Sequence, residues 1–413
     1  MPARKIVRIL TRMNIGGPAI HVAILSNHLD FEQNKTCLIV GSPDSEEGDL
    51  TDWVQTNRVR LIRLNSLRRA IHPWRDLISW IKILRILWEE RPDVIHTHTA
   101  KAGSLGRLAG IGYNAWQKPR QRAKLIHTFH GHVLEGYFSG LLSYIFVTIE
   151  RILAAQTDCL LAVSRRVQDE LLAKGIGHKT QWRVIPVGLD LFSLCQLPLA
   201  QMPAQGIRCG IIGRLVPIKN HRMFLEAIER LSHRYPPQGF SSVIVGDGPL
   251  RQELQDKVSR GKLDDWIRFS GWQCDLRSIY ENLDIVCLTS SNEGTPVALI
   301  EAAAAGRAVV ATDVGGVREI LGADSSSALP IEPGQFEQAA NGLLVRPGDT
   351  PGLVAALTHL IENPDLRQRL GQSGRVSVIE RFGYQRLLKD IAALYNEIDP
   401  RSPPPQGAGS WDK

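Results

Sequence analysis

The chain has 413 residues, too many for one compact core, so we expect two domains, and its 43% hydrophobic and 22% charged content is that of an ordinary soluble globular protein. The formal net charge of +7 is uneven: residues 1–188 hold 26 Lys and Arg against 16 Asp and Glu, whereas residues 189–413 hold 23 against 26. A basic first half indicates an anionic partner, for which a membrane surface, a phosphorylated acceptor and a nucleic acid all qualify. The alternative is a basic surface that contacts only solvent and binds no partner, which would carry the same charge.

The six cysteines are scattered and form no Cys-x-x-Cys pair, which argues against a disulfide framework and for a reducing compartment. The apolar run at the amino terminus is interrupted by Arg8, so it does not resemble a secretory signal. The longest apolar runs, such as 141–149, are too short to span a bilayer. We expect a cytoplasmic protein, with peripheral contact at the inner face of an anionic membrane still open.

The first half alternates β-branched runs with helical patterns, which predicts crossover units and a mainly parallel sheet. In the segment 74–91, apolar residues from Trp74 to Trp88 recur at steps of three and four, and further apolar residues broaden this face. Such a helix is either buried or in contact with lipid, and we expect burial. The predicted strands are 6–10, 36–40, 59–64, 94–96, 125–128, 159–163 and 182–185, and the predicted helices are 18–30, 74–91, 102–116, 137–156 and 165–174.

Periodicity fades over 186–205 and then restarts, so the predicted domains are 1–188 and 189–383. Each reads as a doubly wound, Rossmann-like α/β domain, and two such domains would face one another across a cleft. A final helix, 384–398, is followed by a Pro-rich segment, 399–413, that we expect to be disordered. The second half has predicted strands at 207–212, 243–245, 267–269, 284–288 and 308–311, and predicted helices at 219–233, 249–261, 275–282, 296–305 and 351–363.

The stretch from Ser291 to Gly306 places one carboxylate, Glu301, in an otherwise uncharged helix. Thr295 suits the N-cap and Pro296 the first helical position, which predicts a helix start there. A buried carboxylate needs a partner, and sugar hydroxyls would serve as well as a structural hydrogen bond. The amides of Gly294, Thr295 and Val297 would suit a diphosphate, and Glu293 precedes them closely enough to contact the same ligand.

Two other strand-to-helix turns have an anion-binding character. Arg214 and Lys219 follow a predicted strand and can place two cations on one diphosphate. Gly16 and Gly17 open the first helix, where a backbone can approach a phosphate. The glycines in Val245-Gly-Asp-Gly-Pro249 are more typical of a plain tight turn. The dinucleotide and P-loop fingerprints do not occur, which disfavours dehydrogenases and NTPases of those types.

Histidines cluster at the ends of two predicted strands, in 96–98 and 127–132. Side chains alternate between the faces of a strand, and no Asp or Glu lies close in sequence, so we expect no metal site. His130, at a strand tip, is placed to hydrogen-bond a substrate.

These motifs resemble those of the family 4 glycosyltransferases of the GT-B fold. The similar residues span nearly the whole chain, and the most specific is Glu293-x7-Glu301 with Gly-Thr-Pro inside it and Ala-Ala-Gly306 behind it. Arg214 with Lys219 supports it. The other similar segments are Gly16-Gly17, Asp93–Arg107, His127–His132 and Val245–Pro249.

The resemblance implies a role for each matching residue. Arg214 and Lys219 would hold the donor diphosphate and stabilise the leaving group, and Glu301 would bind the ribose. Glu293 and the Gly294–Val297 segment, including Pro296, would contact the transferred sugar and the phosphates. His130 would lie beside the sugar, and Gly16 and Gly17 would approach the phosphates. The family retains anomeric configuration and uses no metal or other cofactor. Its last helix returns to the first domain.

The sequence therefore predicts a retaining glycosyltransferase that moves a sugar from a UDP-sugar to a lipid-linked or polysaccharide acceptor of the cell envelope. The alternatives are a sugar-nucleotide epimerase or hydrolase of similar fold and a non-catalytic sugar-nucleotide-binding protein. No nucleic-acid-reading motif occurs. Gly322–Ala340 forms a looped insertion relative to the family, either on the surface or at the edge of the active site.

Overall fold

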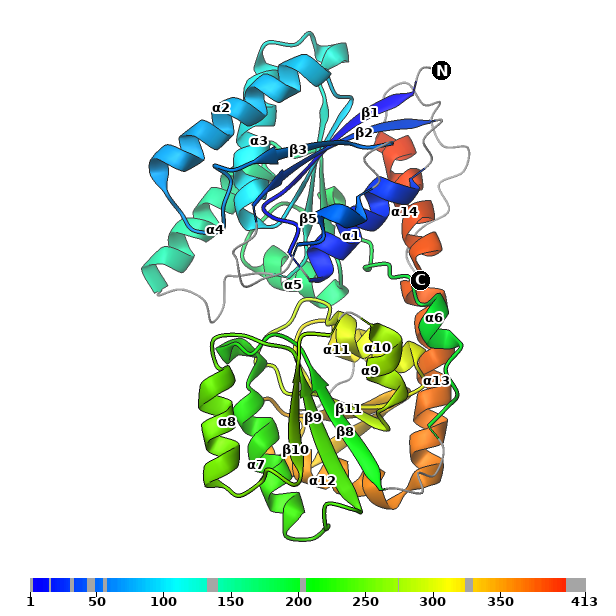
Figure 1. Ribbon diagram of the computed structural model, residues 1–413. Coiled ribbons are helices and arrows are strands. Elements are labelled where there is room, and N and C mark those ends of the chain that lie inside the picture. The colour runs from blue at the N-terminus through cyan, green and yellow to red at the C-terminus, as the bar shows by residue number, and fades with distance from the viewer. Residues whose placement is uncertain are drawn as a thin grey trace. The chain divides into compact units, whose positions relative to one another are not determined.

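The computed structural model describes residues 3–14, 16–29, 33–42, 49–54, 58–131, 140–200, 206–273, 275–323 and 330–398. It divides into a first unit, Met1–Leu189 with Tyr384–Lys413, and a second unit, Asp190–Gly383 (Figure 1). The predicted disordered tail, 399–413, lies outside the described residues. Each unit contains one sheet of seven strands.

The sheet of the first unit is entirely parallel and has the order β3-β2-β1-β4-β5-β6-β7. Most of its strands are fully buried, which explains their β-branched, nearly continuous apolar sequences. The strands are β1 (Arg4–Leu10), β2 (Asn34–Gly41), β3 (Arg60–Leu64), β4 (Val94–His98), β5 (Lys124–Phe129), β6 (Cys159–Ala162) and β7 (Trp182–Val184).

Alternation along these strands separates two apolar layers. Val7 and Ile9 of β1 pack with α2 and α3, whereas Ile6 packs with α1 and α14 on the other face. The helices of this unit are α1 (Gly17–His28), α2 (Pro73–Glu90), α3 (Ala100–Ala115), α4 (Gly140–Ala154), α5 (Arg165–Ala173) and α14 (Tyr384–Ile398), with short 3₁₀ turns at Thr51–Trp53, Pro119–Gln121 and Lys179–Gln181.

Glycines allow α3 to lie unusually close to the sheet. A Cβ at Gly103 would stand 2.3 Å from the His127 ring, and one at Gly106 would stand 2.7 Å from Thr97. A Cβ at Gly110 would stand 2.6 Å from Leu125. The segment that resembles the family from Asp93 to Arg107 therefore has a packing role, because its glycines bring α3 against β4 and β5.

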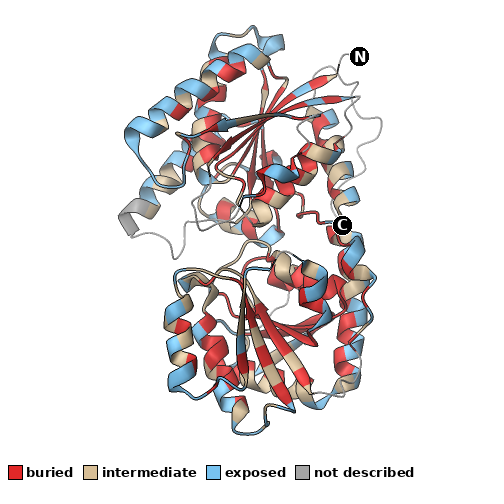
Figure 2. Ribbon diagram, viewed as in Figure 1, coloured by how far each residue is buried: buried red, intermediate tan, exposed pale blue. Residues whose placement is uncertain are grey.

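The expectation that the apolar face of the helix at 74–91 is buried is wrong for most of the residues on that face. Trp74 of α2 is 73% exposed, and Leu77, Ile78, Ile81 and Trp88 are also exposed (Figure 2). The helix contacts the sheet and α3 through its opposite face, because Ile83, Ile86 and Leu87 supply enough apolar surface for that layer. Among the described helices, none combines the length and apolarity that crossing a bilayer requires.

A buried polar network fixes α14 to the sheet. Tyr395 is fully buried, and its hydroxyl lies 2.7 Å from His96 Nδ1. Arg8 donates to Thr36 Oγ1 at 2.9 Å and to the Tyr395 hydroxyl at 3.5 Å. The charge that interrupts the first apolar run therefore has partners on β2 and α14. These contacts place the last helix in the first unit.

The second sheet has the order β10-β9-β8-β11-β12-β14-β13 and is parallel except for the antiparallel edge strand β13. Its strands are β8 (Ile207–Ile212), β9 (Phe240–Val245), β10 (Ile267–Gly271), β11 (Ile285–Leu288), β12 (Ala308–Thr312), β13 (Phe336–Ala339) and β14 (Gly342–Val345).

Helices pack on both faces of this sheet (Figure 1). One large apolar cluster joins β8, β9, β11 and β12 to α7, α8, α12 and α13. The helices are α6 (Phe192–Cys195), α7 (His221–Ser232), α8 (Arg251–Arg260), α9 (Leu276–Glu281), α10 (Val297–Ala304), α11 (Val317–Leu321), α12 (Thr350–Glu362) and α13 (Pro364–Phe382), with a 3₁₀ turn at Pro217–Lys219.

The segment predicted as a looped insertion, 322–340, is only partly a loop. Its end forms β13, which pairs with β14 to cover the edge of the sheet. Both strands, as well as α11 and α13, are absent from the predicted elements. Four-residue strands and a helix with no clear apolar periodicity carry weak sequence signals.

Candidate functional site

Strand order locates a natural ligand site in each sheet. In open parallel sheets, ligands bind beyond the carboxyl ends of the strands where the strand order reverses. In the second unit this point lies between β8 and β11, and in the first unit between β1 and β4. Most of the candidate residues follow these strands or the neighbouring β5.

In the second unit, an ion pair joins the loops after β8 and β11. Lys219 Nζ lies 2.5 Å from Glu293 Oε1, and the hydroxyl of Ser290 donates to the same oxygen at 2.6 Å. The Lys219 side chain is 25% exposed, so it is accessible to a ligand. Arg214 belongs to the same loop as Lys219, two residues beyond the end of β8.

Backbone contacts brace this ion pair from both sides. Gly246, at φ 134°, leaves no room for a Cβ, which would stand 2.1 Å from the Gly213 carbonyl oxygen. The glycine turn after β9 therefore supports the Arg214 loop and is more than a plain turn. On the other side, Gly315 has φ 50°, and a Cβ there would stand 1.9 Å from the carbonyl oxygen of Glu293. The amide of Gly316 donates to the Gly294 carbonyl at 2.7 Å.

The predicted start of the following helix is wrong by one residue. α10 begins at Val297, and Pro296 is its N-cap in an extended conformation with ψ 105°. Thr295 lies before the cap. Proline has no amide hydrogen and a fixed φ, so it suits a non-helical cap as well as a first turn. Gly294, Thr295, Pro296 and Val297 therefore form the connection between the ion pair and α10.

Glu301 is buried within α10, where its neighbours are alanines and other apolar residues. Tyr280 of α9 donates a hydrogen bond to Glu301 Oε2 at 2.8 Å. Burial raises the pKa of Glu301 to about 7, and the Tyr280 hydrogen bond lowers it only partly. Sequence reasoning missed Tyr280, which lies 21 residues earlier in the chain and has no motif around it.

In the first unit, Gly16 is the N-cap of α1, and its carbonyl accepts the amides of Ala19 and Ile20 at 3.1 Å each. Its backbone is extended, with φ 171°. Among the described residues, a Cβ there would meet only Asn14 Nδ2, at 3.7 Å, so no described neighbour requires a glycine. Gly16 places no side chain at the helix start, where Gly17 is the first residue.

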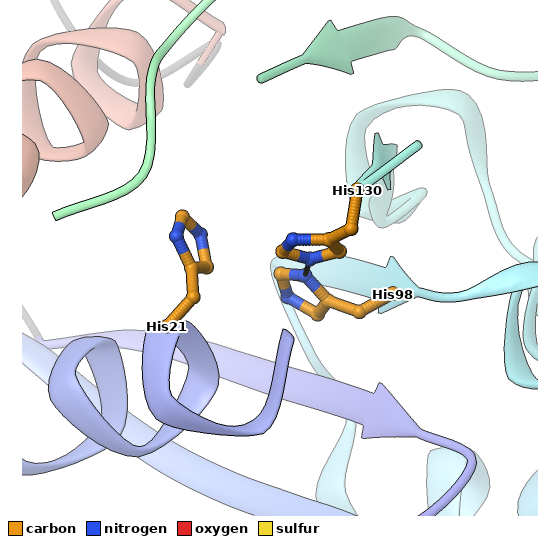
Figure 3. A group of neighbouring side chains, drawn as sticks. All are labelled: His21, His98 and His130. Carbon is orange, nitrogen blue, oxygen red and sulfur yellow. Dashed lines mark hydrogen bonds between the residues drawn. The ribbon is translucent and has the colours of Figure 1, made fainter. Parts of the chain in front are cut away.

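His130 follows β5 and faces two other histidines (Figure 3). Its Nε2 lies 3.1 Å from Nδ1 of His98, at the end of β4, and its ring centroid lies 5.0 Å from that of His21 on α1. Burial lowers the pKa of His130 to about 3, and the pKa values of His21 and His98 also lie well below their usual value, mainly through burial. All three rings are therefore neutral near pH 7.

The expectation that strand alternation keeps these histidines apart is wrong. Residues two apart on a strand share a face, so His96 and His98 both point toward α1 and α14, where His21 also lies. His21 and His98 were absent from the predicted site, since only the fold brings α1 to β4. His127 points to the opposite face, against Gly103, and His132 lies outside the described residues.

Family models match both units of the chain. The model described as Glycosyltransferase Family 4 matches residues 15–191, and the one described as Glycosyl transferases group 1 matches residues 206–363. Together they cover most of the sequence, with the first ending near the boundary between the units.

Individual relatives and solved structures agree with this match. The chain is 26% identical over 345 residues to the putative glycosyltransferase EpsD of Bacillus subtilis, covering 80% of this chain and 83% of the relative. It is 24% identical over 368 residues to the UDP-Gal:alpha-D-GlcNAc-diphosphoundecaprenol alpha-1,3-galactosyltransferase of Escherichia coli, covering 86% and 87%.

Solved structures share the fold, among them the following two. Anabaena Alr3699/HepE, in complex with UDP and glucose, superposes with a TM-score of 0.74 at 19% identity, covering 96% of this chain and all of the other. Sucrose-phosphate synthase from Thermosynechococcus elongatus superposes with a TM-score of 0.75 at 21% identity, covering 96% and 99%. The chain therefore belongs to the family 4 glycosyltransferases, and its two Rossmann-like units are those of the GT-B fold.

Proposed function

We propose that this glycosyltransferase moves a hexose from a UDP-sugar, with retention of anomeric configuration, to a lipid-linked diphosphate or polysaccharide acceptor of cell-envelope synthesis. The observation that carries the proposal is the Lys219–Glu293 ion pair at the switch point of the second sheet. The similarity to the Escherichia coli galactosyltransferase and to Alr3699/HepE with UDP supports the choice of donor and acceptor.

In this proposal the second unit binds the donor. Lys219 and Arg214 hold the diphosphate and neutralise the negative charge that develops on the leaving UDP. Glu293 holds the Lys219 ammonium in place and contacts the transferred sugar, and the Gly294–Val297 segment contacts the sugar and phosphates. Glu301 accepts hydrogen bonds from the ribose hydroxyls while Tyr280 keeps its carboxylate oriented.

The first unit binds the acceptor. Gly16 and Gly17 place no side chain at the start of α1, where a phosphate would bind, and neutral His130 hydrogen-bonds the sugar near the reacting carbon. No side chain is assigned as a general base, and the leaving phosphate would take the acceptor proton. The two cations supply the charge stabilisation that a metal ion gives other enzymes, so we expect transfer without a metal or another cofactor.

An exposed apolar face of α2, which we call the α2 stripe, supplies a surface for the membrane that holds a lipid-linked acceptor. Trp74, Leu77, Ile78 and Ile81 lie on one face of α2, next to the exposed Arg75 and Lys82. The helix α4 also exposes apolar side chains, and α3 packs against both α2 and α4. The exposed residues of α4 are Tyr144, Ile145, Ile149 and Ile152. Apolar side chains with aromatic and basic residues are the composition that binds an anionic bilayer surface. We propose peripheral attachment through this face.

Turnover with and without an acceptor tests the proposed reaction. The full chain is incubated with UDP-glucose, UDP-galactose or UDP-N-acetylglucosamine, each with and without a polyprenyl-diphosphate-linked sugar, and UDP and sugar products are separated by chromatography. We expect UDP release that requires the acceptor, persists in EDTA and gives an α-linked product by NMR. Full turnover to free or epimerised sugar without acceptor would instead establish the hydrolase or epimerase. Donor binding without turnover under any condition would establish a non-catalytic binding protein.

A further inference from the structure

Three histidines from three different elements of the first unit meet at the carboxyl end of its sheet. His21 lies on α1, His98 ends β4 and His130 follows β5 (Figure 3). One nitrogen from each ring can be chosen so that all three lie within 4.8 Å of one another. We call these residues the histidine trio.

The histidine trio makes few hydrogen bonds to the part of the chain that the structure describes. Both ring nitrogens of His21, Nε2 of His98 and Nδ1 of His130 are buried, and none has a partner among the described residues. A buried polar atom without a partner destabilises the folded state, because it has lost its hydrogen bonds to water. His21 can offer either of its nitrogens to a ligand, and a ligand held by His98 Nδ1 and His130 Nε2 would replace the bond between those two atoms, so an added group can complete the site.

We propose that the histidine trio binds a divalent transition-metal ion, with Zn²⁺ as the best match. Imidazole nitrogens suit zinc, copper and nickel, whereas magnesium and calcium prefer oxygen. Zinc–nitrogen bonds of about 2.0–2.1 Å in a tetrahedron place two ligand atoms roughly 3.3 Å apart. His98 Nδ1 and His130 Nε2, at 3.1 Å, already have that separation. His21 completes a three-histidine set by a small side-chain movement.

Neighbouring residues hold the site and shape its fourth position. The His96 ring stacks on His98 at 4.2 Å between centroids and is itself fixed by Thr128 and Tyr395, so His98 has a rigid support. The positive charges of Arg8 and Arg386 act on His21. They oppose a bare cation and favour an anionic oxygen, such as a phosphate oxygen, as the fourth ligand.

Metal binding has a consequence that rests on the proposed function. A metal ion bound to His130 lies beside the ring and competes with the sugar that this ring would otherwise hydrogen-bond. Zinc at the trio is therefore inhibitory, in contrast to the metal-independent transfer proposed above. The binding itself requires only the three rings and does not depend on the reaction.

Spectroscopy on the full chain tests the site directly. Protein freed of metal with EDTA and then dialysed is titrated with Co²⁺, and bound Co²⁺ is then displaced by Zn²⁺ with inorganic phosphate present. We expect one equivalent of Co²⁺ with the visible absorption of a four-coordinate, nitrogen-ligated ion, which Zn²⁺ abolishes. The absence of a stoichiometric Co²⁺ spectrum in the wild-type protein would overturn the proposal.

Variants assign the ion to the trio. We expect His21→Gln and His98→Gln to weaken Zn²⁺ binding at least tenfold, while His28→Ala, an exposed histidine on the same helix as His21, binds as wild type does. Circular dichroism and stabilisation by UDP-sugar check that the variants fold. Unchanged zinc affinity in both Gln variants would refute the assignment.

A zinc titration of the transferase rate separates this inference from the proposed function. Inhibition of the wild type that is relieved in His21→Gln, measured against that variant's own metal-free rate, supports both. Stoichiometric binding without inhibition leaves the metal site standing and contradicts the proposed role of His130.

Discussion

Lys219 Nζ donates to Glu293 Oε1 at 2.5 Å and thereby joins two loops that are 74 residues apart in sequence. One loop follows the first strand of the second sheet and the other follows its fourth, so the bond spans the point where strand order reverses. Glu293 also accepts a hydrogen bond from Ser290, which holds the carboxylate after a ligand draws Lys219 away. The lysine is thus positioned before any diphosphate arrives, and little reorganisation is left for the reaction.

We expect Lys219→Ala to lower kcat about a hundredfold or more, because one key electrostatic donor to the leaving group is lost. Steady-state UDP release in the presence of acceptor measures the effect. Lys257→Ala is a matched control, since it removes the ion pair of Lys257 with Glu226 elsewhere in the same unit. Activity of Lys219→Ala within a fewfold of that control would mean that Lys219 does not contact the diphosphate.

Glu301→Gln should weaken donor binding roughly tenfold or more, because a charge-assisted hydrogen bond to the ribose is replaced by a neutral one. In the wild type, donor affinity should fall as the pH drops through about 7, where Glu301 takes up a proton. Calorimetric titration with UDP from pH 5.5 to 8.5 measures both effects. An affinity that is equally pH-dependent in wild type and Gln variant would assign the titration to another group.

The same substitution should stabilise the ligand-free protein at high pH. Burial raises the pKa of Glu301 from 4.5 to about 7, so the folded state favours the protonated form and is destabilised by the charge once the pH exceeds both values. The glutamine of the variant carries no charge, and the gain in stability should grow between pH 5 and pH 8 to at most about 3 kcal/mol. Urea unfolding at the two pH values measures it, and a gain that shrinks with rising pH would contradict burial as the cause.

Trp74→Asp combined with Ile78→Asp should abolish binding to vesicles that contain anionic phospholipid. The two exposed side chains supply much of the apolar surface of the α2 stripe, and the added carboxylates would be repelled by the lipid headgroups. Vesicle flotation at low and high salt measures the binding. Val376→Asp, which changes a 66% exposed residue of the second unit, should bind as wild type does. Equal loss in both proteins would place the membrane contact elsewhere.

Gly103→Ala should destabilise the first unit, by about 1–3 kcal/mol, because the new Cβ would stand 2.3 Å from the His127 ring. Gly112→Ala lies on the same helix, and its Cβ would meet only Leu84, at 3.8 Å. There the higher helix propensity of alanine should stabilise the protein by about 0.5–1 kcal/mol. Thermal unfolding of the two variants should therefore shift in opposite directions, and a shared direction would contradict the close packing of α3.

Local sequence patterns were sufficient for many elements of both sheets. The strands β1, β2, β8 and β11 are short, apolar and bounded by turn residues, and hydrophobic burial alone makes such segments strands. The same patterns failed for β13 and β14: β14 pairs with β12 and β13, and β13 is a strand only through its pairing with β14 at the sheet edge. Local patterns also failed for the α2 stripe, since helical periodicity does not show which of two apolar faces packs against the sheet.

The sequence by itself determined the alternation of strands and helices, the glutamate pair around α10 and the cations after β8, because these depend on residues close together in the chain. Only the tertiary structure decided which of them touch. Lys219 meets Glu293, Glu301 meets Tyr280, and His21 meets His98 and His130 across separations that no local periodicity encodes. The order of the strands brings these loops together, and that order is selected by burying the apolar faces of all the strands at once.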